Sequence, residues 1–248
     1  IKTMKKGYNT MTTYDFKDGN GPVPAHQHPN GGGWVSDTAT VDEKAFVGPD
    51  AQVYGNAEVS GNAEVSGNAR VSDYAQVSGN VLVFDNALVS GNALVSGNAQ
   101  VYGNAEVSGN AVVSDYAQVS GNAEVSGNAE VYGNAEVYGN AEVSGNALVS
   151  GNALVYGTAE VYGNAVVYGN AVVSKTPVRV SRSDGYDFIL VPCSDGKDRI
   201  IAGYRYFTYE EADKHWNKEH KMYAETTIIL EALKKLYELQ KTSKEGEM

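Results

Sequence analysis

Four histidines and one cysteine are the side chains in this sequence best suited to ligate a metal or attack a substrate. His26 and His28 form an H-x-H pair, which can bind a metal ion, but no third ligand is apparent. His215 and His220 are five residues apart, whereas a metal-binding pair on a helix needs a separation of four. Cys193 lies beside a turn and has no specific partner histidine to activate it. We therefore expect no catalytic residue, no metal site and no cofactor.

The remaining composition narrows the function classes further. The chain has 248 residues, a net charge of −11 and a single cysteine, which excludes an internal disulfide framework. The negative charge argues against binding of a phosphate backbone, so we expect no nucleic-acid partner. No apolar run approaches the roughly 18 residues that a membrane helix needs, so we expect no membrane contact and a cytoplasmic location.

A strict internal repeat makes up most of the chain, so this repeat must position any functional side chains. From Val35 to Val173 every sixth residue is valine, which gives 24 consecutive hexads, typically V-S-G-N-A-E. Alanine follows four residues after the valines, with Val81 as the exception inside the series. Each hexad combines a short extended piece around the valine with a Gly-Asn turn, where left-handed backbone is tolerated. Three such pieces close an 18-residue coil, so the series predicts eight coils over about 38 Å, with valine and alanine inside.

This pattern, Val-x-x-x-Ala-x, resembles the hexapeptide repeat of left-handed parallel β-helices. The Gly31-Gly32-Gly33-Trp34-Val35 lead-in resembles bacterial and phage-type proteins with GNA-x-VSGNA repeats. The resemblance implies a mainly β fold built as a single-stranded left-handed parallel β-helix. Enzymes with this helix are often trimeric acyltransferases or anhydrases that place a histidine near a coil boundary, beside a protruding loop. Here no loop interrupts the hexads, and no histidine lies between residues 35 and 173.

Both ends of the repeat region need a cover, because each coil contacts only its neighbours. We expect an N-terminal cap over residues 1–34, the β-helix over 35–173, and a small C-terminal α+β module over 174–248. Trp34 and Phe46 are predicted to cap the first coil. In the module the pattern predicts strands at 186–192 and 198–206 and helices at about 208–220 and 224–241. The second helix is predicted to bury one apolar stripe: Ile228, Ile229, Ala232, Leu233, Leu236 and Leu239.

The outward residues beside each valine fall into three walls when they are read at 18-residue spacing. One wall collects apolar and aromatic side chains: Leu82, Phe84, Tyr102, Tyr138, Leu154 and Tyr156. Another wall carries an acidic row: Glu106, Glu124, Glu142 and Glu160. The first set predicts a contact surface for a copy of the chain or for a ligand, although stacked tyrosine also simply suits β structure. The acidic row could serve a cation or a basic partner, or be a solvated wall.

The expected function is that of a non-enzymatic structural or interaction protein. In this interpretation the β-helix is a rigid oligomeric scaffold that presents the C-terminal module. The expected homo-oligomer is a trimer, and a dimer is the next alternative. The module is a candidate surface for another protein. One alternative is a hexapeptide-type acyltransferase with a site between subunits. Another is a phage or mobile-element protein that sequesters a host protein or a small ligand.

Overall fold

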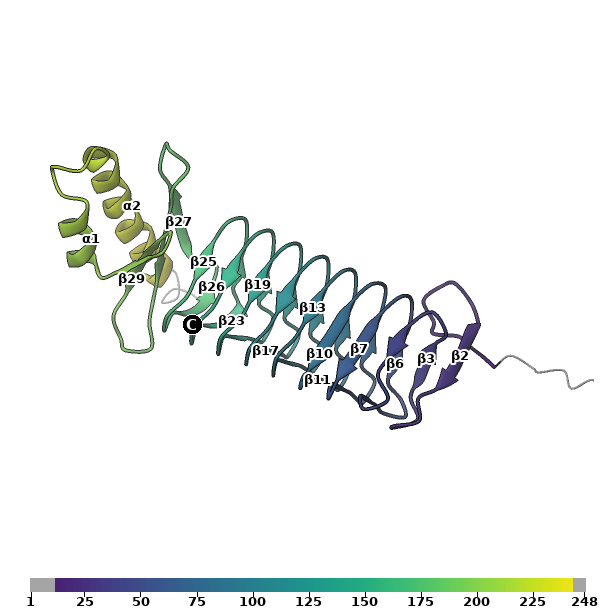
Figure 1. The fold of residues 1–248 in the computed structure, drawn as a ribbon. Helices are drawn as coiled ribbons and strands as arrows, with labels where there is room; N and C mark the ends of the chain where they lie inside the picture. The colour runs from purple at the N-terminus through teal and green to yellow at the C-terminus, as the bar shows by residue number, and fades with distance from the viewer. Residues whose placement is uncertain (1–11, 243–248) are drawn as a thin grey trace, which may run out of the picture.

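The chain forms a parallel β-solenoid with a small C-terminal module of strands and helices (Figure 1). The structure is a computed structural model and describes residues 12–242. Strands 18 residues apart pair in parallel, as Leu88–Val89 does with Glu106–Val107. The mainly β class and the eight 18-residue coils predicted from the valine period are confirmed.

The solenoid has three sheets, one for each wall, and every coil adds one short strand to each sheet. The first sheet contains β1 (Thr13–Tyr14), β2 (Val23–Gln27), β3 (Trp34–Ser36), β6 (Gln52–Val53), β9 (Arg70–Val71), β12 (Leu88–Val89), β15 (Glu106–Val107), β18 (Glu124–Val125), β21 (Glu142–Val143) and β24 (Glu160–Val161). The second contains β4 (Thr40–Val41), β7 (Glu58–Gly61), β10 (Gln76–Gly79), β13 (Leu94–Val95), β16 (Val112–Val113), β19 (Glu130–Val131), β22 (Leu148–Val149) and β25 (Val166–Val167). The third contains β5 (Phe46–Val47), β8 (Glu64–Val65), β11 (Leu82–Val83), β14 (Gln100–Val101), β17 (Gln118–Val119), β20 (Glu136–Val137), β23 (Leu154–Thr158) and β26 (Val172–Lys175).

The interior consists of stacked valine and alanine. From Ala45 to Val173 the inward valines and alanines are at most 3% exposed. Ala39 and Val41 of the first coil are half-buried, because the cap covers the other two sides of that coil more completely. Burial of one valine side chain contributes roughly 1.5–3 kcal/mol, so this core stabilises the coils against the entropy of ordering them.

The corners depend on two residues with separate roles. Glycine adopts the left-handed backbone, as at Gly103 with φ of 72°, whereas asparagine does not, which corrects the expectation that both residues share this conformation. The asparagine amides instead form hydrogen-bonded ladders along the corners. Asn104 donates to Asn122 at 2.9 Å, and Asn122 donates to Asn140 at 2.9 Å. The 18-residue spacing of asparagine is the sequence signal for these ladders.

An antiparallel strand pair covers the N-terminal end of the solenoid. Strand β2 pairs with β1 on one side and with β3 on the other. Tyr14 stacks on Trp34 at 4.4 Å between ring centroids, and the buried Phe16 stacks on Tyr54 at 4.9 Å. A Cβ on Gly33 would collide with the carbonyl of Gly48, so glycine lets this segment cross close to the first coil. Residues 1–11 of the predicted cap lie outside the described residues.

The C-terminal module contains a four-stranded antiparallel sheet and two helices. Its elements are β27 (Val178–Ser181), β28 (Asp187–Val191), β29 (Arg199–Ala202), β30 (Arg205–Phe207), α1 (Tyr209–His215) and α2 (Tyr223–Thr242). Strand β27 was not predicted. The strand predicted over 198–206 is wrong as one element, because Gly203 and Tyr204 form a two-residue hairpin loop between β29 and β30. The capping box of Thr208 and Glu211 is present, but α1 ends at His215 rather than near His220.

The module closes the C-terminal end of the solenoid. Ile189, Val191 and Ile201 face the stacked valines and belong to the same core. Alternate residues of the same strands, Phe188 and Leu190, pack instead against the helices in a second core. The two faces of one sheet therefore serve the solenoid and the helices respectively, and the helices lie beyond the sheet in Figure 1.

The apolar residues of α2 divide between two faces, which corrects the single buried stripe predicted from the sequence. Ile229 and Leu233 are buried against the sheet together with Leu230, Thr226 and Tyr237. Ile228 and Leu239 are 67% and 65% exposed, and Leu236 is 46% exposed. The sheet contacts only part of the helix circumference, so the outer apolar residues remain at the surface.

Candidate functional site

The histidines that could have formed a metal site each have a different environment. The His26 Nδ1 lies 2.9 Å from a carboxylate oxygen of Asp37 at the surface. His28 is 3% exposed, and its Nδ1 lies 3.1 Å from the backbone carbonyl oxygen of Asn30. His215 packs against the rings of Phe207 and Trp216. Within residues 12–242, no group of three or more His, Cys, Asp or Glu side chains could hold a metal ion.

Cys193 lies at the junction between the module and the last coil. It is 7% exposed, and its Sγ lies 2.8 Å from the hydroxyl of Tyr206. Residue Ala171 of the last coil forms a β-bridge with Cys193. The buried position and the tyrosine contact favour a packing role for this thiol over attack on a substrate.

The six apolar and aromatic residues predicted as a contact surface all lie on the third sheet. We call the outer surface of this sheet the aromatic wall. The rings of Phe84 and Tyr102 stack at 4.9 Å with an interplanar angle of 2°. Those of Tyr138 and Tyr156 stack at 5.1 Å with an angle of 10°. All six side chains are half-buried in the isolated chain, and the four rings stack in two pairs across adjacent strands.

Polar residues of the same sheet complete this surface. Ser120 separates the two aromatic pairs, and Gln100, Gln118 and Glu136 occupy the row before the valines. Burial, followed by Tyr156 and Glu136, raises the pKa of Tyr138 above its ordinary value. The sequence-based site did not include the two glutamines and Ser120, although the same 18-residue spacing that identifies the aromatic residues also identifies them.

The acidic row lies on the first sheet, where the four glutamates occupy consecutive strands. Glu106 pairs in register with Glu124, Glu124 with Glu142, and Glu142 with Glu160. Glu106 is half-buried and the other three are exposed. Within the described part of the chain none of the four forms an ion pair. The row is therefore a regular, solvated line of negative charge.

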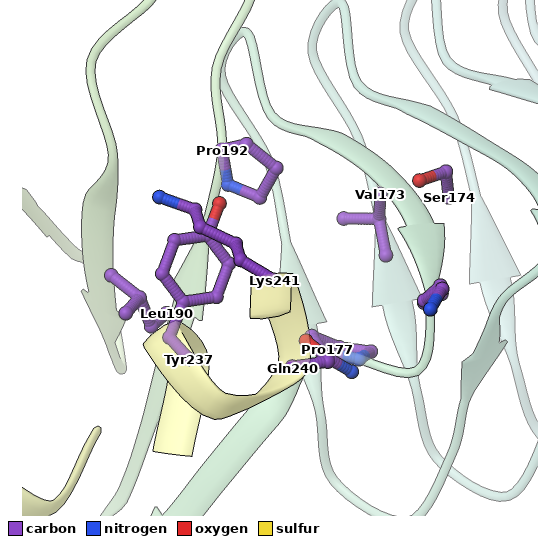
Figure 2. Close-up of a pocket in the computed structure, with 9 residues that line it drawn as sticks. Val173, Ser174, Pro177, Leu190, Pro192, Tyr237, Gln240 and Lys241 are labelled. Atoms are coloured by element: carbon purple, nitrogen blue, oxygen red, sulfur yellow. The ribbon is translucent and has the colours of Figure 1, made fainter. Parts of the chain in front are cut away.

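A cavity of about 170 Å³ lies where α2 meets the end of the solenoid. Figure 2 shows Tyr237 and Lys241 of α2 near Pro192, with Val173 and Ser174 on the opposite side. Tyr237 donates a hydrogen bond to Asp198, and so does Lys241. Their polar groups are thus used within the module, which indicates a packing gap rather than a prepared ligand site.

A larger depression of about 530 Å³ lies between the N-terminal cap and the second coil. Phe16 and Tyr54, which stack on each other, form part of its lining, together with Pro24 and Asp37. Its surface is mainly apolar and open. We therefore regard the aromatic wall, whose residues align over several coils, as the stronger candidate site.

Several segments of the chain match a known repeat family. The YdcK β-solenoid repeat matches residues 75–91, 87–102, 99–115, 141–157 and 159–175. These segments are similar to a β-helix repeat family and include most of the aromatic wall, but they do not cover the sheet and helices of the module. No curated protein and no solved structure matches the chain. None of the described helices is long and apolar enough to span a membrane.

Proposed function

We propose that this protein is a non-enzymatic scaffold that associates with copies of itself through the aromatic wall and presents the C-terminal module at one end. The observation that supports this most is the alignment of two stacked aromatic pairs and two leucines on one sheet. A wall that only faced water would not need six such side chains in register. The caps at both ends favour a solenoid of fixed length over an open filament.

The finer features expected from the resemblance are part of the same proposal. They are the left-handed coil of the hexapeptide helices and a relationship to bacterial or phage-type repeat proteins. A cytoplasmic location also belongs to the proposal. The regular spacing of valine and alanine supports the first of these, because it matches the hexapeptide pattern along the whole repeat, with Val81 as the one exception at an alanine position inside the series.

Light scattering on a Tyr102→Glu, Tyr138→Glu variant tests the proposed self-association. We expect the parent chain to form an oligomer and the variant to have the mass of a monomer, because each new carboxylate would have to be desolvated at the interface. Tyr132→Glu is the matched control, since Tyr132 follows β19 in the second sheet. An unchanged mass for the double variant would contradict an interface at the aromatic wall.

The outer face of α2 is the competing contact surface. Ile228 and Leu239 are largely exposed there and could pair with a second copy or with another protein. An Ile228→Lys, Leu239→Lys variant separates the two surfaces. We expect this variant to keep the parent's mass. A monomeric mass would show that the chain associates through α2 of the module and not through the aromatic wall.

The alternative functions have separate tests. An acyltransferase with a site between subunits would be stabilised by its acyl donor, so thermal shifts with acyl-coenzyme A compounds would reveal it. Acyl transfer that is lost when His26 or His28 is replaced would contradict the scaffold proposal. A sequestering role would instead predict that a foreign ligand binds the aromatic wall of a monomeric chain.

A further inference from the structure

The outward rows of the aromatic wall have nearly the same chemical order in both directions from β17. In the row before the valines the sequence is Leu82, Gln100, Gln118, Glu136 and Leu154. In the row after the valines it is Phe84, Tyr102, Ser120, Tyr138 and Tyr156. Both rows therefore have large apolar residues at the ends and a polar residue in the centre. When such a surface faces its own reversed copy, apolar residues lie opposite apolar residues and polar residues lie opposite polar residues.

Symmetry favours two copies over three. When one surface patch packs on the same patch of another subunit, the contact is isologous and has a two-fold axis. A cyclic trimer instead needs two different patches that fit each other. The aligned aromatic residues lie on one sheet, so the described surface satisfies the first requirement.

We propose that two chains pack face to face through their aromatic walls in antiparallel orientation, with the two-fold axis at β17. This arrangement rests on the proposed self-association and specifies its geometry. Leu82 of one copy then faces Leu154 of the other, and Phe84 faces Tyr156. Tyr102 faces Tyr138, while Gln118 and Ser120 face their own counterparts on the axis.

The one charged residue of the central rows, Glu136, finds a suitable partner in this orientation. It faces Gln100 of the second copy, whose amide can donate a hydrogen bond to the carboxylate. The two-fold axis repeats this contact, so both Glu136 side chains are paired. A parallel arrangement would instead place Gln100 opposite Tyr102 and Glu136 opposite Tyr138. The antiparallel order thus provides an amide for the Glu136 carboxylate of each copy. Glu64, on the outermost overlapping strand β8, faces Val172 instead and has to remain solvated at the rim.

The size of the wall predicts modest affinity. Reversal about β17 overlaps the strands from β8 to β26, at spacings of about 4.8 Å and with extended segments roughly 13 Å long. This corresponds to about 450 Å² per subunit, or about 900 Å² in total, which is below the roughly 1,000 Å² of a stable specific interface and in the range of weak, transient ones. We therefore expect a dimer that dissociates on dilution.

Cross-linking of cysteine variants tests the orientation. Leu82→Cys and Leu154→Cys chains are treated with a short bismaleimide, separately and as a mixture, with the parent chain as the control for Cys193. We expect dimeric product from the mixture and not from either variant alone, because reversal separates identical residues at these positions. Product from Leu82→Cys alone would overturn the antiparallel orientation, and so would failure of the mixture to react while the parent is dimeric.

A charge exchange provides a second test, read out by sedimentation. Gln100→Glu should weaken the dimer at least tenfold by placing two carboxylates opposite each other, and Glu136→Gln in the same chain should restore it. Gln76→Glu on the second sheet is the matched control. Absence of rescue, or a trimeric mass of the parent, would overturn the arrangement. A parent that stays monomeric at every concentration would overturn the proposed self-association itself.

Discussion

Three aspartates occupy corner positions that elsewhere belong to glycine. Asp73, Asp85 and Asp115 have φ values of 60°, 60° and 59°, a left-handed conformation that costs a non-glycine residue roughly 1–2 kcal/mol. Each carboxylate accepts a hydrogen bond from a glycine N–H in the next coil, at distances of 3.0, 3.2 and 3.1 Å. The side chain thereby offsets the strain of its own backbone and connects two coils.

Replacement of Asp115 separates these two contributions. Asp115→Ala keeps the left-handed strain and loses the hydrogen bond, so we expect it to lower the free energy of unfolding by about 1–2 kcal/mol. Asp115→Gly also loses the bond but removes the strain, so we expect a change within about 0.5 kcal/mol. Urea denaturation followed by circular dichroism measures both. Equal destabilisation by the two variants would contradict the compensation.

At the scale of the element, the asparagine ladders connect successive coils along each corner. Their members occur at 18-residue intervals, and a tyrosine replaces asparagine at two corners, Tyr74 and Tyr116. Asn92 begins a ladder after Tyr74, and another ladder begins at Asn134 after Tyr116. These two corners are therefore interrupted by tyrosine, whereas on the third corner one ladder runs without interruption from Asn68 to Asn140.

Asn122 and Asn56 form a matched pair for measuring one ladder contact. Both are exposed corner residues, but Asn122 lies inside a ladder, whereas the next coil presents Tyr74 opposite Asn56. We expect Asn122→Ala to lower the free energy of unfolding by about 1 kcal/mol, because two amide hydrogen bonds are lost. Asn56→Ala should change it by a few tenths. Similar losses for both variants in urea titrations would show that the ladders do not stabilise the coils.

The repeat was predictable in detail and the module only in part. A valine at every sixth residue leaves one way to bury the apolar side chains, so the register follows directly from the sequence. In the module, Ile200 and Ile201 looked like part of a longer strand, and the hairpin loop at Gly203 interrupts it. The apolar arc of α2 exceeds what the sheet can cover, and sequence periodicity alone cannot show which part is buried. The aromatic residues of the candidate site followed from the 18-residue spacing. The polar residues between them lie on the same rows, but the sequence-based site did not include them.

Four half-buried or buried tyrosines at and near the junction of module and solenoid predict sensitivity to high pH. Burial raises the pKa of Tyr168 to about 12 and also raises the pKa values of Tyr206, Tyr209 and Tyr237. A group whose folded pKa is raised contributes stability below its unfolded pKa, and this contribution is lost as pH rises through the folded value. Stability should therefore decrease between pH 10, the ordinary tyrosine value, and about 12.

We expect the module to unfold before the central coils when the pH is raised. Trp216 is buried in the module, so its fluorescence in a Trp34→Phe chain reports the module alone. Far-UV circular dichroism follows the solenoid at the same time. Tyr168→Phe is expected to reduce the alkaline sensitivity. Simultaneous loss of both signals, unchanged by that substitution, would contradict a separate alkaline transition at the junction.

At the scale of the whole molecule, the negative charge is concentrated on the solenoid and not on the C-terminal module. Residues 35–173 contain 15 acidic and 2 basic residues, a net charge of −13, whereas residues 174–248 contain 13 of each. The solenoid is therefore a negatively charged rod that ends in a neutral module. Any self-association through its walls must overcome repulsion between two such rods.

Salt should therefore strengthen the proposed dimer. Repulsion between the exposed carboxylates is screened as the Debye length falls from about 10 Å at 0.1 M to about 3 Å at 1 M salt. Apolar contacts are not weakened by this screening, so we expect the dissociation constant to fall several-fold over that range. Sedimentation equilibrium in sodium chloride measures it. A dissociation constant that rises with salt would show that ion pairs, rather than the aromatic wall, hold the subunits together.

The triangular coil also governs how the gene can change length. Repetitive coding sequence gains and loses units during replication, and loss of a single hexad would leave the valine core intact. Every later outward residue would nevertheless move to the neighbouring wall, so a hexad lost between Tyr102 and Tyr138 would leave Tyr138 and Tyr156 out of line with Phe84 and Tyr102. Only loss or gain of three hexads at a time preserves the walls, and even then the row order centred on Ser120 would be disturbed. Selection for a functional surface would thus restrict inherited length changes to multiples of three hexads. It would also fix the number of coils.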